Sequence, residues 1–265
     1  MQDLKVTLVQ VDLAWENKQA NLDHISTLLK DVRDTDLIIL PEMFSTGFSM
    51  RSKDLAENMM GNSVRWMRDL ASAKNAAVCG SLIIEDDEKF YNRLIWMEPD
   101  GTSAHYDKRH LFSLAGEDKH YTGGKHKIFP ELKEWKILPL ICYDLRFPVW
   151  SRQSPPFTEL GANPYHLLVY VANWPERRVY AWEQLLIARA IENQCYVVGV
   201  NRIGMDGNDV YHNGCSLVVD PMGQKLYESK GEESVKTLTL SGLQLESIRE
   251  KLPFLDDRDE FELRR

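Results

Sequence analysis

Cys142 stands where an apolar run turns abruptly polar. Residues 137–141 are apolar, and Tyr143, Asp144 and Arg146 follow the cysteine. A strand that ends here would fix the backbone while the next turn exposes the sulfur, which is how a nucleophilic cysteine is presented. A structural cysteine would more often stay inside the apolar run. This stretch alone therefore leaves catalysis and a structural role both open.

Two further ionisable residues follow apolar, strand-like runs. Glu42 comes after residues 37–40, and Lys108 comes after residues 102–106. In α/β folds, functional sites gather at the carboxyl ends of the strands. If these strands and the one before Cys142 share a sheet, a carboxylate, an ammonium and a thiol meet at one edge. Taken singly, Glu42 also fits a surface acid and Lys108 a solvated charge cluster.

Together these three groups are sufficient for acyl transfer. The Cys142 thiolate attacks a carbonyl carbon, and the Glu42 carboxylate takes the thiol proton and later gives it to a leaving amine. The Lys108 ammonium stabilises both the thiolate and the oxyanion that develops on the substrate. The backbone N–H of Tyr143 is placed to donate a second hydrogen bond to that oxyanion.

The elements that must position these residues alternate between strand and helix along the chain. This alternation predicts a layered α/β fold with helices on the sheet faces. No Pro/Gly/Ser-rich linker interrupts it, so we expect one domain over residues 1–265, in which 241–265 form a C-terminal helix and tail. Strands are predicted at 4–11, 37–40, 77–84, 90–97, 102–106, 135–141, 167–172, 196–200, 214–219 and 233–240, and helices at 17–32, 63–74, 148–151, 179–193 and 243–252.

Two local patterns refine this outline. The turn Asp220-Pro221-Met222-Gly223 is expected to join strand 214–219 to strand 233–240, and Ser154-Pro155-Pro156 is expected to cut the helix at 148–151 short. Residues 111–127 are polar and contain three glycines, which predicts a long loop.

Composition restricts the function classes. Apolar residues make up 43% and charged residues 27% of the 265, which is ordinary for a soluble globular protein. The net charge of −8 argues against a general nucleic-acid binder. No apolar run is long enough to span a membrane, and no signal peptide is visible. Four cysteines without a CxxC pair favour a reduced, cytoplasmic protein.

Several segments, taken together, resemble the nitrilase superfamily of carbon–nitrogen hydrolases. The motifs that carry the resemblance span most of the chain from about residue 4 to about residue 240. They are Leu40-Pro41-Glu42-Met43-Phe44 with Gly47-Phe48, Tyr106-Asp107-Lys108-Arg109-His110-Leu111-Phe112, Ile141-Cys142-Tyr143-Asp144-Leu145-Arg146-Phe147-Pro148, Ala172-Asn173-Trp174-Pro175, Ala188-Arg189-Ala190-Ile191-Glu192-Asn193-Gln194, Asn201-Arg202-Ile203-Gly204 and Asp220-Pro221-Met222-Gly223.

The resemblance implies an α/β fold of one specific kind, a four-layer α-β-β-α sandwich, usually assembled as a homodimer through its outer helices. It implies Cys142 as nucleophile, Glu42 as general base and acid, and Lys108 as stabiliser of the oxyanion. It also implies a second glutamate in the loop after the lysine, where Glu117 fits, although Glu117 also fits a solvated loop acid. No metal or organic cofactor is implied, and the scattered histidines form no recognisable ligand set.

Within the superfamily the pattern is most similar to the omega-amidases, which release ammonia from 2-oxoglutaramate or 2-oxosuccinamate. Asn173-Trp174-Pro175 with Arg177, Arg178 and Trp182 carries this finer resemblance. Such a substrate has a carboxylate remote from its amide, which calls for a cation at the far end of the pocket. The candidate cations are Arg146, Arg177, Arg178 and Arg202, and the candidate wall residues are Phe44, Tyr143 and Trp174.

Other functions share parts of this pattern. An N-carbamoyl amino acid amidohydrolase or a nitrilase would use the same Glu42, Lys108 and Cys142, so only the pocket can separate these from an omega-amidase. A non-catalytic binding protein would not need the complete set. A redox protein would need a resolving cysteine close to Cys142 in sequence, and there is none. Cys79, Cys195 and Cys215 are expected to be structural.

Overall fold

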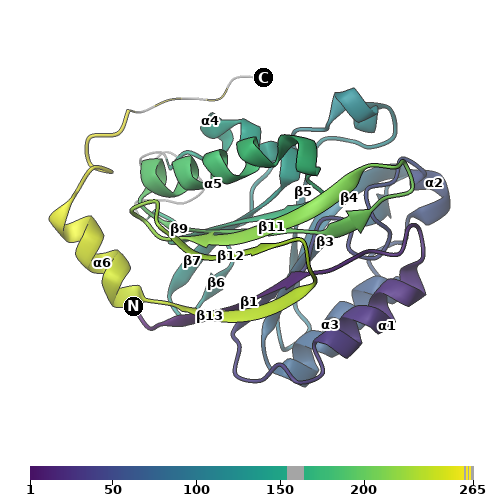
Figure 1. The fold of residues 1–265 in the computed structure, drawn as a ribbon, viewed down its shortest axis with the longest axis horizontal. Helices are drawn as coiled ribbons and strands as arrows, with labels where there is room; N and C mark the ends of the chain where they lie inside the picture. Colours follow the sequence, from purple (N-terminus) through teal and green to yellow (C-terminus); the bar gives the residue numbers. More distant parts are fainter. Residues whose placement is uncertain (154–163, 260, 262, 264–265) are drawn as a thin grey trace.

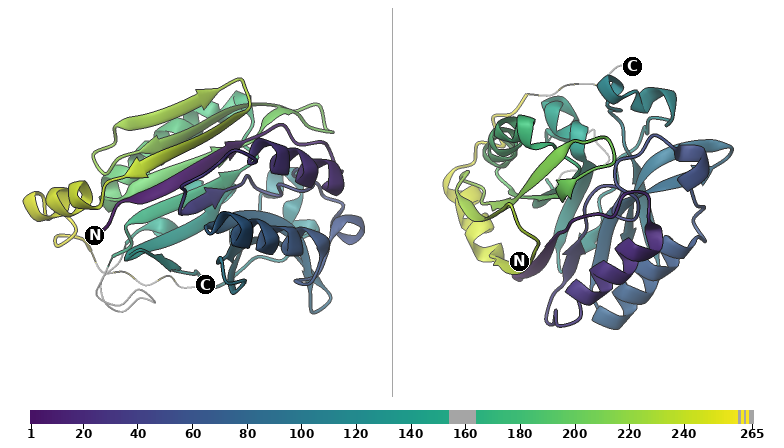
Figure 2. Two further views of the ribbon diagram at one scale, coloured as in Figure 1. Left: turned by 90° about the horizontal axis from the view of Figure 1, so that it is seen from below. Right: turned by 45° about the vertical axis from the view of Figure 1, so that its right-hand side comes forward.

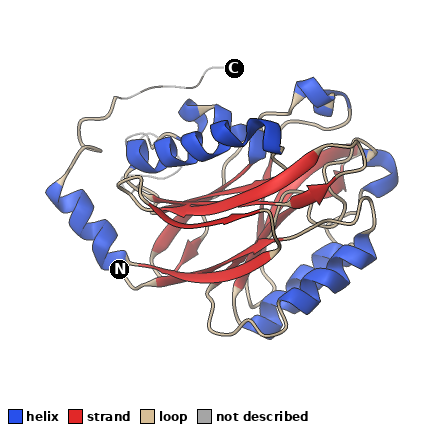
Figure 3. Cartoon of the chain, viewed as in Figure 1, coloured by secondary structure: helices blue, strands red, loops and turns tan. Residues whose placement is uncertain are grey.

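The computed structural model describes residues 1–153, 164–259, 261 and 263. The expected break at Ser154-Pro155-Pro156 lies outside the described residues. Two mixed β-sheets face each other, and helices cover their outer faces (Figure 1). Figure 3 shows the same layering as blue helices around red strands. The predicted four-layer α/β sandwich is confirmed.

The first sheet has the strand order β13-β1-β2-β3-β4-β5. Strands β1, β2 and β3 are parallel, β4 and β5 follow as antiparallel hairpin partners, and β13 pairs antiparallel with β1. Two reversals bring β5 back to the direction of β2. Its strands are β1 (Leu4–Gln10), β2 (Leu37–Ile39), β3 (Ala77–Asp86), β4 (Lys89–Met97), β5 (Ser103–Asp107) and β13 (Ser234–Leu240).

The second sheet has the order β10-β11-β9-β8-β7-β6, with β12 paired to β11. Its centre consists of the parallel strands β7, β8 and β9, which are continuous apolar runs buried on both faces. Its strands are β6 (Glu131–Leu132), β7 (Trp135–Ile141), β8 (Leu167–Ala172), β9 (Tyr196–Asn201), β10 (Ile203–Met205), β11 (Tyr211–Val219) and β12 (Lys225–Lys230).

The helices complete the outer layers. Helices α1 (Lys18–Leu28) and α3 (Asn62–Lys74) lie side by side on the first sheet, and α5 (Val179–Asn193) lies on the second (Figure 2). Helix α6 (Gly242–Lys251) lies at the edge of the sandwich. The short helices α2 (Ser52–Leu55) and α4 (Pro148–Ser151) belong to the loops after β2 and β7.

The side chains of strand β2 point alternately into two hydrophobic cores, one on each face of the first sheet. Leu37 and Ile39 pack into the core between the sheets, whereas Ile38 packs beneath α1 and α3. Successive side chains of a strand point to opposite faces, so three apolar residues in a row serve both cores. Each such side chain contributes roughly 1.5–3 kcal/mol through burial.

One predicted connection is wrong. The turn at 220–223 joins β11 to β12, whereas β13 lies in the other sheet beside β1. Strand β12 has the sequence Lys-Leu-Tyr-Glu-Ser-Lys and is mostly exposed or half-buried. Charged edge strands of this kind lack the apolar pattern on which strand prediction depends. For this reason the sequence pattern points to the next apolar run, at 233–240, as the strand that pairs with β11.

Candidate active site

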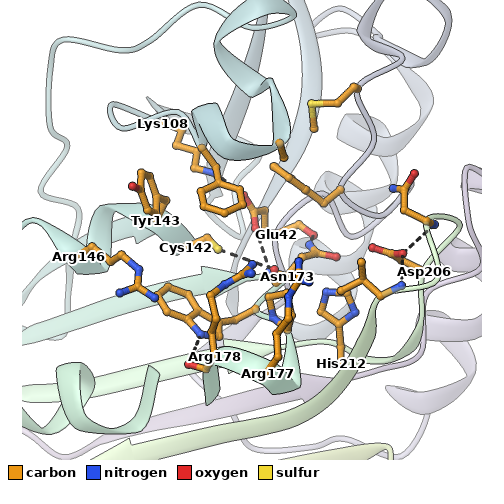
Figure 4. Close-up of a pocket in the computed structure, with 18 residues that line it drawn as sticks. Glu42, Lys108, Cys142, Tyr143, Arg146, Asn173, Arg177, Arg178, Asp206 and His212 are labelled. Atoms are coloured by element: carbon orange, nitrogen blue, oxygen red, sulfur yellow. Dashed lines mark hydrogen bonds and ion pairs between the residues drawn. The ribbon is translucent and has the colours of Figure 1, made fainter. Parts of the chain in front are cut away.

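The expected meeting of Glu42, Lys108 and Cys142 occurs, but the three strands do not share one sheet. Glu42 follows β2 and Lys108 follows β5 in the first sheet, whereas Cys142 follows β7 in the second. All three line the same cavity (Figure 4). The expectation of a common sheet was wrong because apolar runs identify buried strands without showing which of two facing sheets each strand joins.

Cys142 begins a short helical turn directly at the end of β7. Its φ is +42°, in the left-handed region that non-glycine residues rarely occupy. Such strain persists only where the surroundings over-determine it. Arg189 on α5 helps to fix this backbone conformation, because it donates a hydrogen bond of 2.6 Å to the Leu145 carbonyl in the same turn. The side chain is only 9% exposed, and Sγ lies 4.0 Å from the Asn173 carbonyl oxygen.

Lys108 is shared by two buried carboxylates. Its Nζ lies 2.8 Å from Glu42 Oε1 and 2.9 Å from Glu117 Oε2, and all three side chains are at most 1% exposed. The Phe112 N–H donates a further hydrogen bond of 2.6 Å to Glu117. Glu117 is thus a buried partner of Lys108 and not a solvated loop acid.

Two asparagines that sequence reasoning missed complete this arrangement. Asn92 Nδ2 donates to Glu42 at 2.8 Å and to Glu117 at 3.2 Å. The Asn173 N–H donates to Glu42 Oε2 at 2.8 Å, which connects the end of β8 to the loop after β2. Asn92 and Arg93 interrupt the aromatic and aliphatic residues of β4, and this polar pair was a usable signal, because a buried amide requires polar partners.

Burial dominates the electrostatics of these groups. Burial and the nearby Glu42 carboxylate raise the pKa of the Cys142 thiol well above its ordinary value. Burial raises the pKa of Glu117, Lys108 opposes that rise, and Glu42 adds to it. Burial alone would lower the pKa of Lys108, but Glu117 and Glu42 raise it above its ordinary value. The resting site therefore holds a protonated thiol beside a permanent ammonium.

The cavity above Cys142 has a volume of about 290 Å³ and is lined by groups of two kinds. Glu42, Lys108 and Cys142 form one part of its lining. Arg146, Arg177 and Arg178 form another, with Arg177 and Arg178 rising from below Cys142 in Figure 4 while Lys108 lies above it. The remaining lining residues include Phe48, Met50, Phe112, Tyr143, Trp174, Asp206, Asn208 and His212.

Two of the three arginines lie over aromatic rings. The Arg146 guanidinium lies 4.9 Å from the Trp174 ring centroid, and that of Arg178 lies 5.2 Å from the Phe112 centroid. Within the described part of the chain, no carboxylate forms an ion pair with any of the three. Burial and the adjacent Arg177 lower the pKa of Arg178, as expected for a guanidinium that faces other cations. This region of the cavity suits an anion.

Two predicted pocket residues lie elsewhere. Phe44, which the sequence predicts on the cavity wall, is instead fully buried under α3, and its ring centroid lies 5.7 Å from that of Trp66. Phe48 lines the cavity in its place. Arg202 is fully buried and pairs with Asp12 at 2.9 Å. Both residues follow strand ends in the sequence, and sequence does not reveal whether such a side chain turns inward or towards the site.

One group among the described residues could hold a metal ion, and it lies outside the cavity. Glu183, Cys215 and Glu228 approach one another, but Lys225 and Lys230 already pair with both carboxylates. No described helix is long and apolar enough to cross a membrane.

Comparisons with known proteins agree with this geometry. A family model described as carbon-nitrogen hydrolase matches residues 5–251. The omega-amidase YafV of Escherichia coli K12 is 43% identical, with 99% of this chain and 100% of the relative aligned. The 2-oxoglutaramate amidase of Bacillus subtilis is 32% identical, with 95% and 96% aligned.

Solved structures extend the similarity to three dimensions. XC1258 of Xanthomonas campestris, a CN-hydrolase superfamily protein crystallised with an arsenic adduct in its active site, is 42% identical. It superposes on this chain with a TM-score of 0.97 over 100% of both chains. Saccharomyces cerevisiae Nit3, of the nitrilase superfamily, superposes with a TM-score of 0.81 at 27% identity over 95% of both chains.

Proposed function

The chain belongs to the carbon–nitrogen hydrolase family, and on that premise we propose that it is an omega-amidase. Its substrates are the monoamides of 2-oxo dicarboxylic acids, such as 2-oxoglutaramate, and its products are the 2-oxo acid and ammonia. Relatives named omega-amidase and 2-oxoglutaramate amidase align over nearly their full length, which supports this substrate class.

One observation carries the proposal. The same cavity that contains Cys142 also presents Arg146, Arg177 and Arg178, which have no carboxylate partner among the described residues. Charge-assisted hydrogen bonds to guanidinium groups are the usual means of binding a carboxylate. An amide placed at Cys142 with its remote carboxylate at the arginines satisfies both parts of the cavity.

In the first step, Cys142 Sγ attacks the amide carbon and its proton passes to Glu42. The C=O π electrons move to oxygen, and the Lys108 ammonium stabilises the resulting oxyanion together with the Tyr143 N–H. Glu42 then gives the proton to the amide nitrogen, the C–N bond breaks, and ammonia leaves. A thioester on Cys142 remains.

In the second step, water attacks the thioester carbon and Glu42 accepts a proton from it. The C–S bond breaks, Glu42 returns its proton to sulfur, and the product leaves as a carboxylic acid that gives its remaining proton to the solvent. Because the pKa of the Cys142 thiol is raised, transfer to Glu42 has to accompany the attack. Glu117 holds Lys108 in place and does not itself touch the reacting atoms. Cys142 supplies the nucleophile and Glu42 carries the proton in both steps, so the proposed mechanism draws on no cofactor.

Ammonia release tests the substrate class. We expect 2-oxoglutaramate to be hydrolysed with a higher kcat/KM than glutamine, an N-carbamoyl amino acid or a simple nitrile under one set of conditions. Cys142→Ala should abolish the release, whereas Cys195→Ala, which alters a buried cysteine outside the cavity, should retain it. Activity confined to the carbamoyl compound and the nitrile would refute the omega-amidase assignment and leave the family intact.

The arginines can be tested through the Michaelis constant. Replacing Arg146, Arg177 or Arg178 by alanine should raise KM for 2-oxoglutaramate about 10–100-fold where that arginine binds the carboxylate, as the loss of one charge-assisted hydrogen bond predicts. KM for an uncharged amide of similar length should change little. Arg33→Ala, at an exposed site, is the matched control. An unchanged KM ratio in all three variants would rule out carboxylate binding by this cluster.

We further propose that the enzyme is a cytoplasmic homodimer in which residues 1–265 form one catalytic domain. Four free cysteines support a reducing compartment. The outer helix α5 leaves Tyr180 and Ile191 exposed, and such apolar side chains suit a contact between copies.

A further inference from the structure

We propose that Asp144 is a positioning residue that fixes the Cys142 sulfur relative to the Lys108 ammonium. The inference rests on the proposed function in one respect, which is that Cys142 and Lys108 are its reacting pair. Asp144 lies two residues after Cys142, is fully buried and does not line the cavity. It therefore acts through other residues and not on the substrate.

The Asp144 carboxylate accepts four hydrogen bonds. Oδ2 accepts from the Tyr106 hydroxyl at 2.7 Å and from the Ile141 N–H at 3.1 Å. Oδ1 accepts from the His110 N–H at 3.1 Å and from His110 Nδ1 at 2.8 Å. Both oxygens are thus saturated within the protein, as a buried carboxylate requires.

The residues that donate these hydrogen bonds flank Lys108 and Cys142 in the sequence. Tyr106 lies two residues before Lys108 and His110 lies two residues after it, while Ile141 immediately precedes Cys142. One carboxylate therefore connects both sides of Lys108 to both sides of Cys142. Lys108 follows a strand of the first sheet and Cys142 a strand of the second, so these bonds also cross the interface between the sheets.

The Tyr106 hydroxyl is the second centre of this network. It donates to Asp144 and accepts from the Arg109 N–H at 3.1 Å and from Trp150 Nε1 at 3.0 Å. Burial and the adjacent Asp144 raise the pKa of Tyr106 well above its ordinary value, so it keeps the proton that it donates. The His110 ring stacks on Phe147, with centroids 3.8 Å apart, which holds the imidazole against the carboxylate.

Directional bonds are needed here because apolar packing alone does not fix a distance between reacting groups. The core between the sheets is held mainly by hydrophobic burial, which has no directional preference. A misplacement of about 1 Å can cost about 10²-fold in rate. The Asp144 network supplies the missing geometric constraint at the point where Cys142 and Lys108 face each other.

The test measures both turnover and the intrinsic reactivity of Cys142. Tyr106→Phe removes one donor and keeps the ring, and Asp144→Asn replaces one acceptor oxygen by a donor. We expect kcat for 2-oxoglutaramate to fall about 10–100-fold with KM changed less than about threefold. The rate of Cys142 alkylation by iodoacetamide should fall in parallel, since a displaced Lys108 stabilises the thiolate less.

Repeating the alkylation assay in a Lys108→Met variant distinguishes a role in positioning Lys108 from a general effect on the folded structure. If Asp144 and Tyr106 act through Lys108, then Tyr106→Phe should no longer slow alkylation once Lys108 is replaced. Tyr196→Phe is the matched control, because it removes a hydroxyl that bonds to Ser241 and Gln244 and not to this network. That control should leave the alkylation rate unchanged. If Asp144→Asn does not fold, Tyr106→Phe carries the test alone.

Two outcomes would overturn the inference. One is a lowered melting temperature in Tyr106→Phe with normal kcat and normal alkylation. The other is an equal slowing of alkylation with and without Lys108. Alkylation needs no amide substrate, so its result stands even if 2-oxoglutaramate is not hydrolysed. Conversely, normal ammonia release with unaffected alkylation would retain the proposed function and remove only the role of Asp144.

Discussion

At the scale of single residues, the cluster of Glu42, Glu117 and Lys108 contains more acidic than basic groups. Lys108 faces two carboxylates, Glu42 and Glu117, and all three are buried. Removing ions from water is costly, and one ammonium compensates only one of the two carboxylates fully. Asn92, which donates to both, offsets part of that cost. The arrangement suits chemistry better than stability, as is common for active sites.

Glu117→Gln should reveal this cost through its pH dependence. Because the pKa of Glu117 is raised in the folded protein, the native state binds its proton more tightly than the unfolded state. Its contribution to the free energy of unfolding is therefore present below the unfolded pKa and is lost as pH rises through the folded pKa. As pH rises above the ordinary carboxyl pKa of 4.5, the urea midpoint of the wild type should fall relative to that of Glu117→Gln.

Turnover provides the second readout for Glu117. Since the variant holds Lys108 less firmly, kcat should drop about 10²-fold, whereas Asp118→Asn at the exposed neighbouring position should behave as wild type in both assays. Parallel midpoints for wild type and Glu117→Gln across the pH range would contradict the assignment of the raised pKa.

At the scale of elements, the loop that contains Gly124 packs against the backbone at the end of β5. The Gly124 N–H donates to the Lys108 carbonyl at 3.0 Å. A Cβ added at Gly124 would lie 2.0 Å from the Asp107 carbonyl oxygen, which belongs to the backbone and cannot simply rotate away. The loop after Lys108 can therefore approach the strand closely only with glycine at this position.

Gly124→Ala should displace the backbone that carries Lys108. We expect kcat to fall at least about tenfold, with a smaller change in KM, and steady-state kinetics would measure both. Gly231→Ala is the control: its φ of +77° makes alanine strained, but nothing lies within 4 Å of the added Cβ. That variant should lose stability without losing turnover, and equal losses of turnover in both variants would count against the displacement.

The same scale shows what sequence patterns can and cannot predict here. Strands β7 and β8 and helix α5 begin and end where their apolar patterns predict, because long periodic segments specify their own secondary structure. The pairing of β11 with β12 and the assignment of β2 and β7 to different sheets were missed, since both depend on contacts distant in sequence. Phe44 was misplaced for the same reason.

At the scale of the whole molecule, the stability of the sandwich should depend on acidity. His166 precedes β8, and its Nδ1 accepts a hydrogen bond of 3.0 Å from the Lys136 N–H at the start of β7. Only a neutral imidazole can accept in this way. Burial, with Arg249 and Lys136 nearby, lowers the pKa of His166 to about 4.

Acid should therefore weaken the contact between β7 and β8 and lower the free energy of unfolding. A lowered folded pKa means that the unfolded state binds the proton more readily, so this stability is present above an unfolded pKa near 6.5 and is lost as pH falls through about 4. In His166→Gln, whose amide oxygen can still accept from Lys136, the urea midpoint should fall less steeply between pH 6.5 and 4. The exposed His120→Gln should keep the wild-type slope, and an unchanged slope in His166→Gln would exclude this contribution.

The division of the site between two sheets has a consequence for protein engineering. Glu42 and Lys108 belong to one sheet and Cys142 to the other, and the core between the sheets sets how far apart they stand. In a protein whose site lies on one sheet, the volume of core side chains mainly affects thermostability. Here each methylene group added to or removed from the inter-sheet core also changes the spacing of the reacting groups. Core volume is thus a catalytic variable in this fold, and a designer who seeks heat resistance should begin under α1 and α3.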